Sequence, residues 1–344
     1  MTATAREHDR TAADDEPILA VEDLAVEFAT ADGLVKAVNG VSFSVRAGET
    51  LAIVGESGSG KSVTAQAVMG LLQSPPARIS SGSIRLKGRD LLAMSRHQHR
   101  AMCGDHVAMV FQDALAALNP VYSVGWQLAE ALVARGRMSR REARARAVEL
   151  LDLVKVPNAK QRVKEYPHQF SGGMRQRVMI AMALALEPEV LIADEPTTAL
   201  DVTVQAQIMR LLAEIQAERD MGMVLITHDL GVVADVADSV TVMYAGRAVE
   251  QASALDAFAQ PAHPYTQALL RSIPRLDRKG QELEVIGGRP PELTNIPPGC
   301  PFHPRCRHAR DICGEGEPPP VLEPAPGRTV ACHFAEEVMA DVER

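Results

Sequence analysis

Residues 55–62 carry the residue types and spacing that bind nucleotide phosphates. They read Gly-Glu-Ser-Gly-Ser-Gly-Lys-Ser and fit the pattern G-x-x-x-x-G-K-[ST] at each fixed position. The stretch follows the apolar run 51–54, which reads as a buried strand, and a helix is expected to begin after Lys61. Glycines let backbone N–H groups turn inward around an anion, and a helix N-terminus adds positive charge there. A glycine-rich turn without a ligand is the alternative, and this strand-loop-helix context disfavours it.

The last two residues of the loop have specific predicted roles. Lys61 places a charge at the β- and γ-phosphates, and the hydroxyl of Ser62 is suited to Mg²⁺. The residues expected to contact the nucleotide or its metal are Gly55, Ser57, Gly58, Ser59, Gly60, Lys61 and Ser62.

Residues 190–194 read as a second continuous apolar strand, and it ends in an acidic pair, Asp194 and Glu195. Nucleotide-binding α/β sheets present their ligands at such carboxyl strand ends. Asp194 is suited to hold Mg²⁺, and Glu195 to orient or deprotonate an attacking water. A solvated turn is the alternative for the pair. A third buried strand, 223–227, leads to His228, which can donate a hydrogen bond to a γ-phosphate, although a lone histidine is more often structural.

The elements that position these residues are predicted on both sides of the loop. Residues 62–72 carry the helical spacing expected behind a phosphate loop. Residues 105–111 read as a buried strand that ends on Gln112. In residues 113–163 apolar residues recur at helical spacing, which predicts a helical insertion.

Before the loop, residues 18–45 alternate apolar and polar side chains, with breaks at 31–33 and at Asn39-Gly40. This pattern predicts an antiparallel β region. Phe28 lies in it, and its ring could stack on an adenine or belong to the core.

The composition argues against two classes of protein. The chain has 344 residues, a formal net charge of -8 and a pI near 5.7, with no basic stripe, so nucleic acid is not expected as its main partner. No uncharged run reaches the ~20 residues that cross a bilayer. Residues 1–16 are polar and lack the apolar region of a signal peptide, which predicts a disordered tail and a place in the cytosol.

Residues 170–177 narrow the choice among the families that share a phosphate loop. They read Phe-Ser-Gly-Gly-Met-Arg-Gln-Arg and lie between the phosphate loop and Asp194. With this segment, residues 18–250 resemble the ATPase subunit of ABC transporters, with the motifs of that family in the expected order. The segment departs from the common signature Leu-Ser-Gly-Gly-Gln at Phe170 and Met174. The serine hydroxyl and the N–H groups at the following helix start remain available for a γ-phosphate.

The resemblance implies an α/β fold, a P-loop ABC ATPase domain with an antiparallel β subdomain, a helical subdomain and a Cys-containing C-terminal extension. It implies ATP and Mg²⁺ as ligands, the metal being held by Ser62, Gln112 and Asp194, and it makes Glu195, His228 and Gln112 catalytic. The remaining implied contacts with ATP are Phe28 on the adenine, the signature residues Ser171, Gly172 and Gly173, and Asp201 of the D-loop.

The same resemblance implies partners. In this family the signature serine completes the ATP site of the opposite subunit, so a second ATPase subunit is required. It is either a copy of this chain or a close relative, and a paralogous partner is favoured. Residues 111–113, 118–120 and 263–266, together with the proline- and cysteine-containing tail, resemble the oligopeptide/dipeptide and nickel importers. Two membrane-spanning permease subunits and an extracytoplasmic solute-binding protein are therefore implied, with this chain peripheral on the cytoplasmic face of the membrane.

Peptide import is accordingly the predicted function. Import of nickel or another small solute is the alternative, followed by a non-transport ABC ATPase; a non-catalytic module is disfavoured by the intact ATP motifs. The predicted division is a tail over 1–16, an ATPase domain over 17–252 with its helical subdomain at about 113–163, and an extension over 253–344.

The extension contains four of the five cysteines, Cys300, Cys306, Cys313 and Cys332. In a cytosolic protein such a cluster favours a metal site over disulfides. The family resemblance implies that some members hold a [4Fe-4S] cluster here, so iron-sulfur is favoured, with zinc and plain structural cysteines as alternatives. The segment has too few apolar residues for a core of its own, which predicts a metal as its support. Because the cysteines lie outside every ATP motif, the extension is expected to be independent of nucleotide binding.

Overall fold

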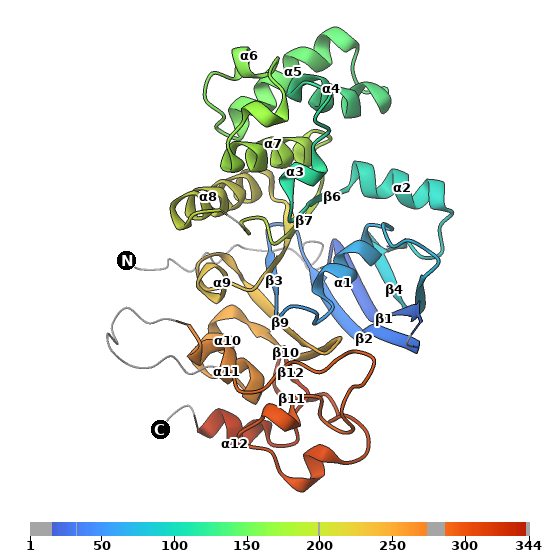
Figure 1. The fold of residues 1–344 in the computed structure, drawn as a ribbon, viewed down its shortest axis with the longest axis vertical. Coiled ribbons are helices and arrows are strands. Elements are labelled where there is room, and N and C mark those ends of the chain that lie inside the picture. The colour runs from blue at the N-terminus through green and yellow to red at the C-terminus, as the bar shows by residue number, and fades with distance from the viewer. Residues whose placement is uncertain (1–15, 32, 199, 274–285, 342–344) are drawn as a thin grey trace.

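A mixed eight-stranded sheet runs through the centre of the computed structural model, which describes residues 16–31, 33–198, 200–273 and 286–341 (Figure 1). The strand order is β11-β12-β10-β9-β3-β8-β7-β6. The strands are β3 (Thr50–Val54), β6 (Val107–Val110), β7 (Val190–Asp194), β8 (Gly222–Thr227), β9 (Ser239–Tyr244), β10 (Arg247–Ser253), β11 (Leu322–Ala325) and β12 (Arg328–Val330). Strands β6, β7, β8, β3 and β9 are parallel, whereas β10, β12 and β11 extend the sheet in antiparallel pairs. The α/β class predicted from the motifs is confirmed.

A second, antiparallel sheet has the order β2-β1-β4-β5. Its strands are β1 (Leu19–Thr30), β2 (Gly33–Val45), β4 (Ala77–Leu86) and β5 (Arg89–Asp90). The predicted β region is present, but Asn39-Gly40 does not separate two strands. Strand β2 continues through both residues, and Gly40 adopts a φ of 74° beside a shift of register. The Asn-Gly pair therefore marks an irregularity within a strand.

The central sheet is apolar on both faces, as expected for buried parallel strands. In β7, Leu191 and Ala193 pack into one cluster with the helices α7 (Gly172–Leu184) and α8 (Val202–Arg219). Val190 and Ile192 point the other way, into a cluster that contains the second sheet and α1 (Lys61–Val68). The alternation fixes the register of the sheet and hence the positions of the residues at its strand ends.

The remaining helices flank these layers. α2 (Arg96–Asp105) leads into β6, and α9 (Leu230–Val236) follows β8. Within residues 113–163 the structure has α3 (Ala114–Ala117), α4 (Val124–Ala134), α5 (Arg140–Leu153) and α6 (Ala159–Arg162), followed by the 3₁₀ helix η1 (Pro167–Gln169). Figure 1 shows these helices gathered at one end of the molecule. None of the described helices is both long and apolar enough to cross a membrane.

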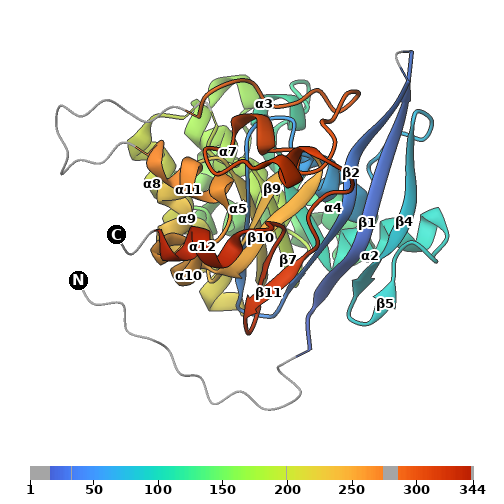
Figure 2. The same ribbon diagram turned by 90° about the horizontal axis from the view of Figure 1, so that it is seen from below.

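The C-terminal segment is built onto the ATPase sheet. Strand β12 pairs with β10, and Figure 2 shows this segment, in red, lying along β10 and α11. Its helices are α10 (Ala254–Ala259), α11 (Pro264–Arg271), the 3₁₀ helices η2 (His303–Arg305) and η3 (Asp311–Gly314), and α12 (Ala335–Ala340). The division at residue 253 stays a prediction, and all of the predicted tail before Glu16 lies outside the described residues.

A buried ion pair fastens β12 to β10. Arg328 Nη2 donates to Glu250 Oε1 at 2.7 Å, and the two side chains are only 5% and 0% exposed. The same carboxylate accepts the backbone N–H groups of Ala262 and His263, at 2.8 and 2.9 Å. Glu250 therefore connects β10, β12 and the turn before α11.

We expect Arg328→Ala to lower the free energy of unfolding by about 3 kcal/mol or more, because it leaves a buried carboxylate without its cation. Urea unfolding measures the loss. Arg85→Ala is the matched control, since Arg85 pairs with Glu22 at 3.0 Å on the second sheet and both side chains are exposed. It should cost less than ~1 kcal/mol. Equal losses in the two variants would show that the buried pair contributes no more to the free energy of unfolding than the exposed pair.

Candidate nucleotide site

The phosphate loop connects β3 to α1 in a conformation that requires glycine at three positions. Gly55, Gly58 and Gly60 have φ values of 149°, 79° and 101°. A Cβ on Gly55 would lie 2.2 Å from the carbonyl oxygen of Met243, and one on Gly60 would lie 2.4 Å from that of Ala37. The loop thus lies against the backbone of β9 and β2, where side chains cannot fit.

Lys61 is folded back onto this loop. Its Nζ donates to the carbonyl oxygens of Gly55 and Glu56 at 2.8 and 2.9 Å, and it lies 3.4 Å from Ser59 Oγ. Burial lowers the pKa of the Lys61 ammonium, while the carboxylates of Glu195 and Asp194 act in the opposite direction. The ammonium is therefore held by loop oxygens and nearby acids.

Ser62 and Asp194 meet across the site. Ser62 Oγ donates to Asp194 Oδ1 at 3.0 Å, which joins the first turn of α1 to the end of β7. Asp194 is 5% exposed, and its burial raises the pKa of the carboxyl, partly opposed by the hydrogen bond from Ser62. The hydroxyl of Ser62 and the carboxylate of Asp194 are thus close together, and both are oxygen donors of the kind that bind Mg²⁺.

Glu195 is the meeting point of three further side chains. Gln112 Nε2 donates to its carboxylate at 3.0 Å, and Thr198 Oγ1 at 2.9 Å. His228 Nδ1 lies 3.6 Å from Glu195 Oε1. Glu195 has a positive φ of 45°, and its N–H donates to the carbonyl oxygen of Ile226 at 2.8 Å. The structure thus brings together Gln112, Glu195 and His228 from three strand ends.

The signature segment lies elsewhere. Ser171 is the exposed N-cap residue of α7, which packs against α3, α4, α5 and α8, whereas α1 packs against β1, β2 and β7. A Cβ on Gly173 would lie 2.6 Å from Val204 Cγ1 of α8. Asp201 is the N-cap of α8 and accepts from Val204 N at 3.0 Å. In one chain, therefore, the signature and the phosphate loop occupy different places.

Phe28 lies on β1, partly buried against the cluster that contains α1. Its predicted contact with adenine and its core role are both compatible with this position.

Sequence reasoning missed the roles of Thr198 and of two residues of the C-terminal segment, Tyr265 and Arg305. Tyr265 OH accepts the N–H of Glu56 at 2.8 Å, and Arg305 contacts the Glu56 carboxylate. These contacts span more than 200 residues of sequence, so no local pattern predicts them. They also differ from the expectation that the extension is independent of the ATP site.

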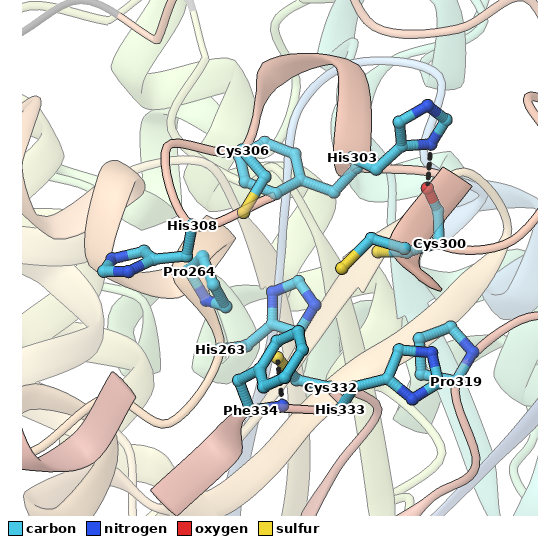
Figure 3. Close-up of a pocket in the computed structure, with 12 residues that line it drawn as sticks. His263, Pro264, Cys300, His303, Cys306, His308, Pro319, Cys332, His333 and Phe334 are labelled. Carbon is cyan, nitrogen blue, oxygen red and sulfur yellow. Dashed lines mark hydrogen bonds between the residues drawn. The ribbon is translucent and has the colours of Figure 1, made fainter. Parts of the chain in front are cut away.

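The prediction of an iron-sulfur cluster, or of zinc in its place, is wrong. Cys300, Cys306, Cys313 and Cys332 do line one small pocket (Figure 3). In the ranges that the structure describes, however, no group of three or more His, Cys, Asp or Glu side chains is arranged to hold a metal ion. Burial raises the pKa of Cys306 and of Cys332 to about 11, so these thiols are neutral in the metal-free chain.

The segment is supported by shared packing. Phe302 is 2% exposed, and its ring centre lies 5.3 Å from that of Tyr244 and 5.2 Å from that of Tyr265. Phe302 and Tyr265 of the extension share one apolar cluster with β9 of the central sheet, and the ion pair of Glu250 and Arg328 adds a second attachment. These contacts replace the metal as the physical support.

Comparison with solved structures defines the class of protein. The fold is similar to a dimeric post-hydrolysis state of the ATP-binding cassette MJ0796 bound to ADP and Pi, with a TM-score of 0.62 and 26% identity over 69% of this chain and 98% of that chain. It is also similar to cbiO1 from Clostridium perfringens, part of an ABC transporter complex, with a TM-score of 0.61 and 32% identity over 71% and 92% of the two chains. Fold and site together define an ATP-binding cassette.

Sequence comparisons identify the family. The sequence model of the family described as "ABC transporter" matches residues 38–198. The sequence model described as "Oligopeptide/dipeptide transporter, C-terminal region" matches residues 249–313. The chain is 52% identical to the dipeptide transport ATP-binding protein DppD of Bacillus subtilis (strain 168), over 94% of this chain and 96% of the relative. It is 54% identical to the oligopeptide transport ATP-binding protein OppD of Escherichia coli (strain K12), over 92% of each. The chain belongs to the ATP-binding subunits of ABC transporters, in the oligopeptide/dipeptide subgroup.

Gly60→Ala should destabilise the protein before any nucleotide is added, by about 2 kcal/mol or more, because it combines a left-handed backbone with a backbone clash. Urea unfolding without ATP measures this. Gly58→Ala is the control, since Gly58 also has positive φ but has open space around its Cβ position. It should cost about 1 kcal/mol. If both variants lose the same stability, the close approach to Ala37 does not constrain the loop.

Proposed function

We propose that the chain binds Mg²⁺-ATP at the loop of residues 55–62 and hydrolyses it to drive peptide import. The observation that carries the proposal is that Asp194 and Glu195 lie close enough to Lys61 to act on its charge. Ser62 donates a hydrogen bond to Asp194, and Gln112 donates one to Glu195. Phosphoryl transfer needs mainly positioning and charge stabilisation, and these are the groups that provide them.

The oxygen donors fit a magnesium ion. Ser62 and Asp194, with Gln112 beside Glu195, would hold it; the hydroxyl and carboxylate already share one hydrogen bond. When bound, the metal neutralises charge on the β- and γ-phosphates. Because Asp194 is buried and its pKa is raised, a cation beside it would also favour its ionised form.

Glu195 is the proposed general base. Gln112 and Thr198 hold one oxygen of its carboxylate, and His228 lies beside the other. Such fixed contacts orient the carboxylate toward a water that attacks the γ-phosphate. His228, whose side chain is 65% exposed, is free to turn toward the same phosphate and donate a hydrogen bond.

The assembly is proposed from the family. The relatives carry names of dipeptide and oligopeptide transport, which supports import of peptides powered by this subunit. A second ATPase subunit, with a paralogous chain favoured, would bring its signature to the phosphate loop of this chain. Permease subunits, an extracytoplasmic solute-binding protein and a peripheral position on the cytoplasmic face complete the proposal. The proposed division is an ATPase domain over 17–252 and an extension over 253–344.

Glu195→Gln should keep ATP binding but lower steady-state hydrolysis at least ~100-fold, because the amide cannot accept a proton. Lys61→Ala is the paired variant, and it should instead weaken ATP binding, since it removes the buried charge of the loop. Calorimetry of the isolated subunit and phosphate release from the complete transporter separate the two effects. Wild-type turnover in Glu195→Gln would remove the base assignment, and unchanged affinity in Lys61→Ala would remove the phosphate site.

A groove on the helical insertion is the proposed contact with a permease. It has a volume of about 780 Å³ and lies between α4, α5 and the segment before η1. Trp126 and Tyr166 line it and are 49% and 42% exposed. The ring of Tyr122 stacks on Trp126 at a centroid distance of 4.0 Å. Exposed aromatic residues around a groove are typical anchors of protein interfaces.

Trp126→Ala should weaken assembly with the permease subunits at least ~30-fold, as expected for loss of an aromatic anchor. Binding of the labelled subunit to permeases in detergent measures this, and ATP affinity of the isolated subunit should not change. Leu255→Ala is the control, because Leu255 is 78% exposed on α10, outside the groove. Equal binding by the two variants would place the interface elsewhere.

A further inference from the structure

The phosphate loop contains an acidic residue, Glu56, whose carboxylate forms an ion pair with a residue far along the chain. Glu56 directly follows Gly55, and its backbone oxygen accepts the Nζ of Lys61 at 2.9 Å. Its carboxylate therefore lies beside a loop that must receive a polyanion. An uncompensated negative charge in that position would oppose phosphate binding.

Arg305 of the C-terminal segment neutralises this carboxylate. Its Nη1 donates to Glu56 Oε2 at 2.6 Å and its Nη2 donates to Oε1 at 3.0 Å, a two-pronged pair. The Arg305 side chain is 4% exposed and that of Glu56 is 27% exposed. Paired and partly buried charges of this geometry are among the stronger polar contacts in proteins.

The guanidinium group is itself held in place. Arg305 Nε donates to the carbonyl oxygen of Gly287 at 2.9 Å, and Nη1 lies 3.2 Å from Tyr244 OH. The group also lies over the rings of Tyr244 and Phe302, 5.8 and 5.9 Å from their centres. Such fixed donors lose little entropy when they bind a carboxylate.

A second contact from the same segment reaches the backbone of Glu56. The N–H of Glu56 donates to Tyr265 OH at 2.8 Å, and Tyr265 is fully buried in α11. Burial raises the pKa of this phenol, so the hydroxyl remains protonated and neutral. Both the side chain and the N–H of Glu56 are thus bound by residues that follow Ser253, whereas its carbonyl group faces Lys61.

We propose that Arg305 is a positioning residue for ATP binding: through Glu56 it holds the phosphate loop and cancels the negative charge beside it. The extension then makes nucleotide affinity depend on its own folded state. A detached extension would leave Glu56 as an unpaired anion next to the phosphates. This inference rests on the proposed phosphate site and goes beyond it, because it assigns a role in that site to the C-terminal segment.

Arg305→Ala in the full chain should weaken Mg²⁺-ATP binding about tenfold, since it leaves a carboxylate unpaired beside an anionic ligand. Adding Glu56→Gln to the same chain should restore affinity to within about threefold of wild type, because the repelling charge is gone. Calorimetry with Mg²⁺-ATP measures both. In the assembled transporter, Arg305→Ala should raise KM for ATP and leave kcat within about twofold, as expected when binding is affected and not chemistry.

Arg310→Ala is the matched control, because Arg310 belongs to the same segment but pairs with Glu337 and lies over the ring of Phe334. It should bind ATP as wild type does. If Arg305→Ala does not fold, Arg305→Lys is used in its place; it keeps the charge but loses the two-pronged geometry, and we expect about threefold weaker binding.

Three results would overturn the inference: wild-type affinity in Arg305→Ala, wild-type affinity in Arg305→Lys where that variant stands in for it, or no recovery on adding Glu56→Gln. Lys61→Ala, measured in parallel, shows whether the phosphate site itself is misassigned or only the role of the extension is rejected. If Lys61→Ala binds ATP normally, the site itself is misassigned. If Lys61→Ala binds weakly and Arg305→Ala binds normally, the site stands and only the role of the extension is rejected.

Discussion

The buried ammonium of Lys61 sets the conditions for the rest of the site. A cation removed from water must be surrounded by oxygen acceptors, and here two loop carbonyl groups accept from it while Asp194 and Glu195 lie near enough to favour its charged form. To point those carbonyl groups inward, the loop needs the positive φ values of its glycines, including Gly60 at the start of α1. β8 pairs with β3 and β7 pairs with β8, all in parallel, so the ends of the three strands lie at the same edge of the sheet.

This arrangement also explains which features can be predicted from sequence. Residues 55–62, Asp194 and Glu195 each follow an apolar strand, so a local pattern and the rule that parallel strands present ligands at one edge place them together. Strand β7 was predicted with its actual bounds, and β8 to within one residue. These features are local in sequence, and each level of evidence points to the same answer.

Features that depend on distant contacts were not predictable in this way. Asn39-Gly40 has the composition of a turn, but pairing with β1 keeps β2 continuous. The clustering of cysteines between Cys300 and Cys332 predicts a metal, yet Phe302 reaches a core made by Tyr244 and Tyr265. The pair of Arg305 and Glu56 joins residues 249 positions apart, and no periodicity or motif carries that information.

We propose that residues 55–62 receive the phosphates of ATP and that the signature acts on the partner's site. Hydrogen exchange of the Glu195→Gln protein with and without Mg²⁺-ATP tests it most directly. We expect slower exchange at residues 55–62 and at the start of α1 in the subunit alone, and slower exchange at Ser171–Gly173 only when the second ATPase subunit is added. Unchanged exchange at 55–62, or protection of Ser171–Gly173 in the isolated chain at concentrations where it is monomeric, would contradict it.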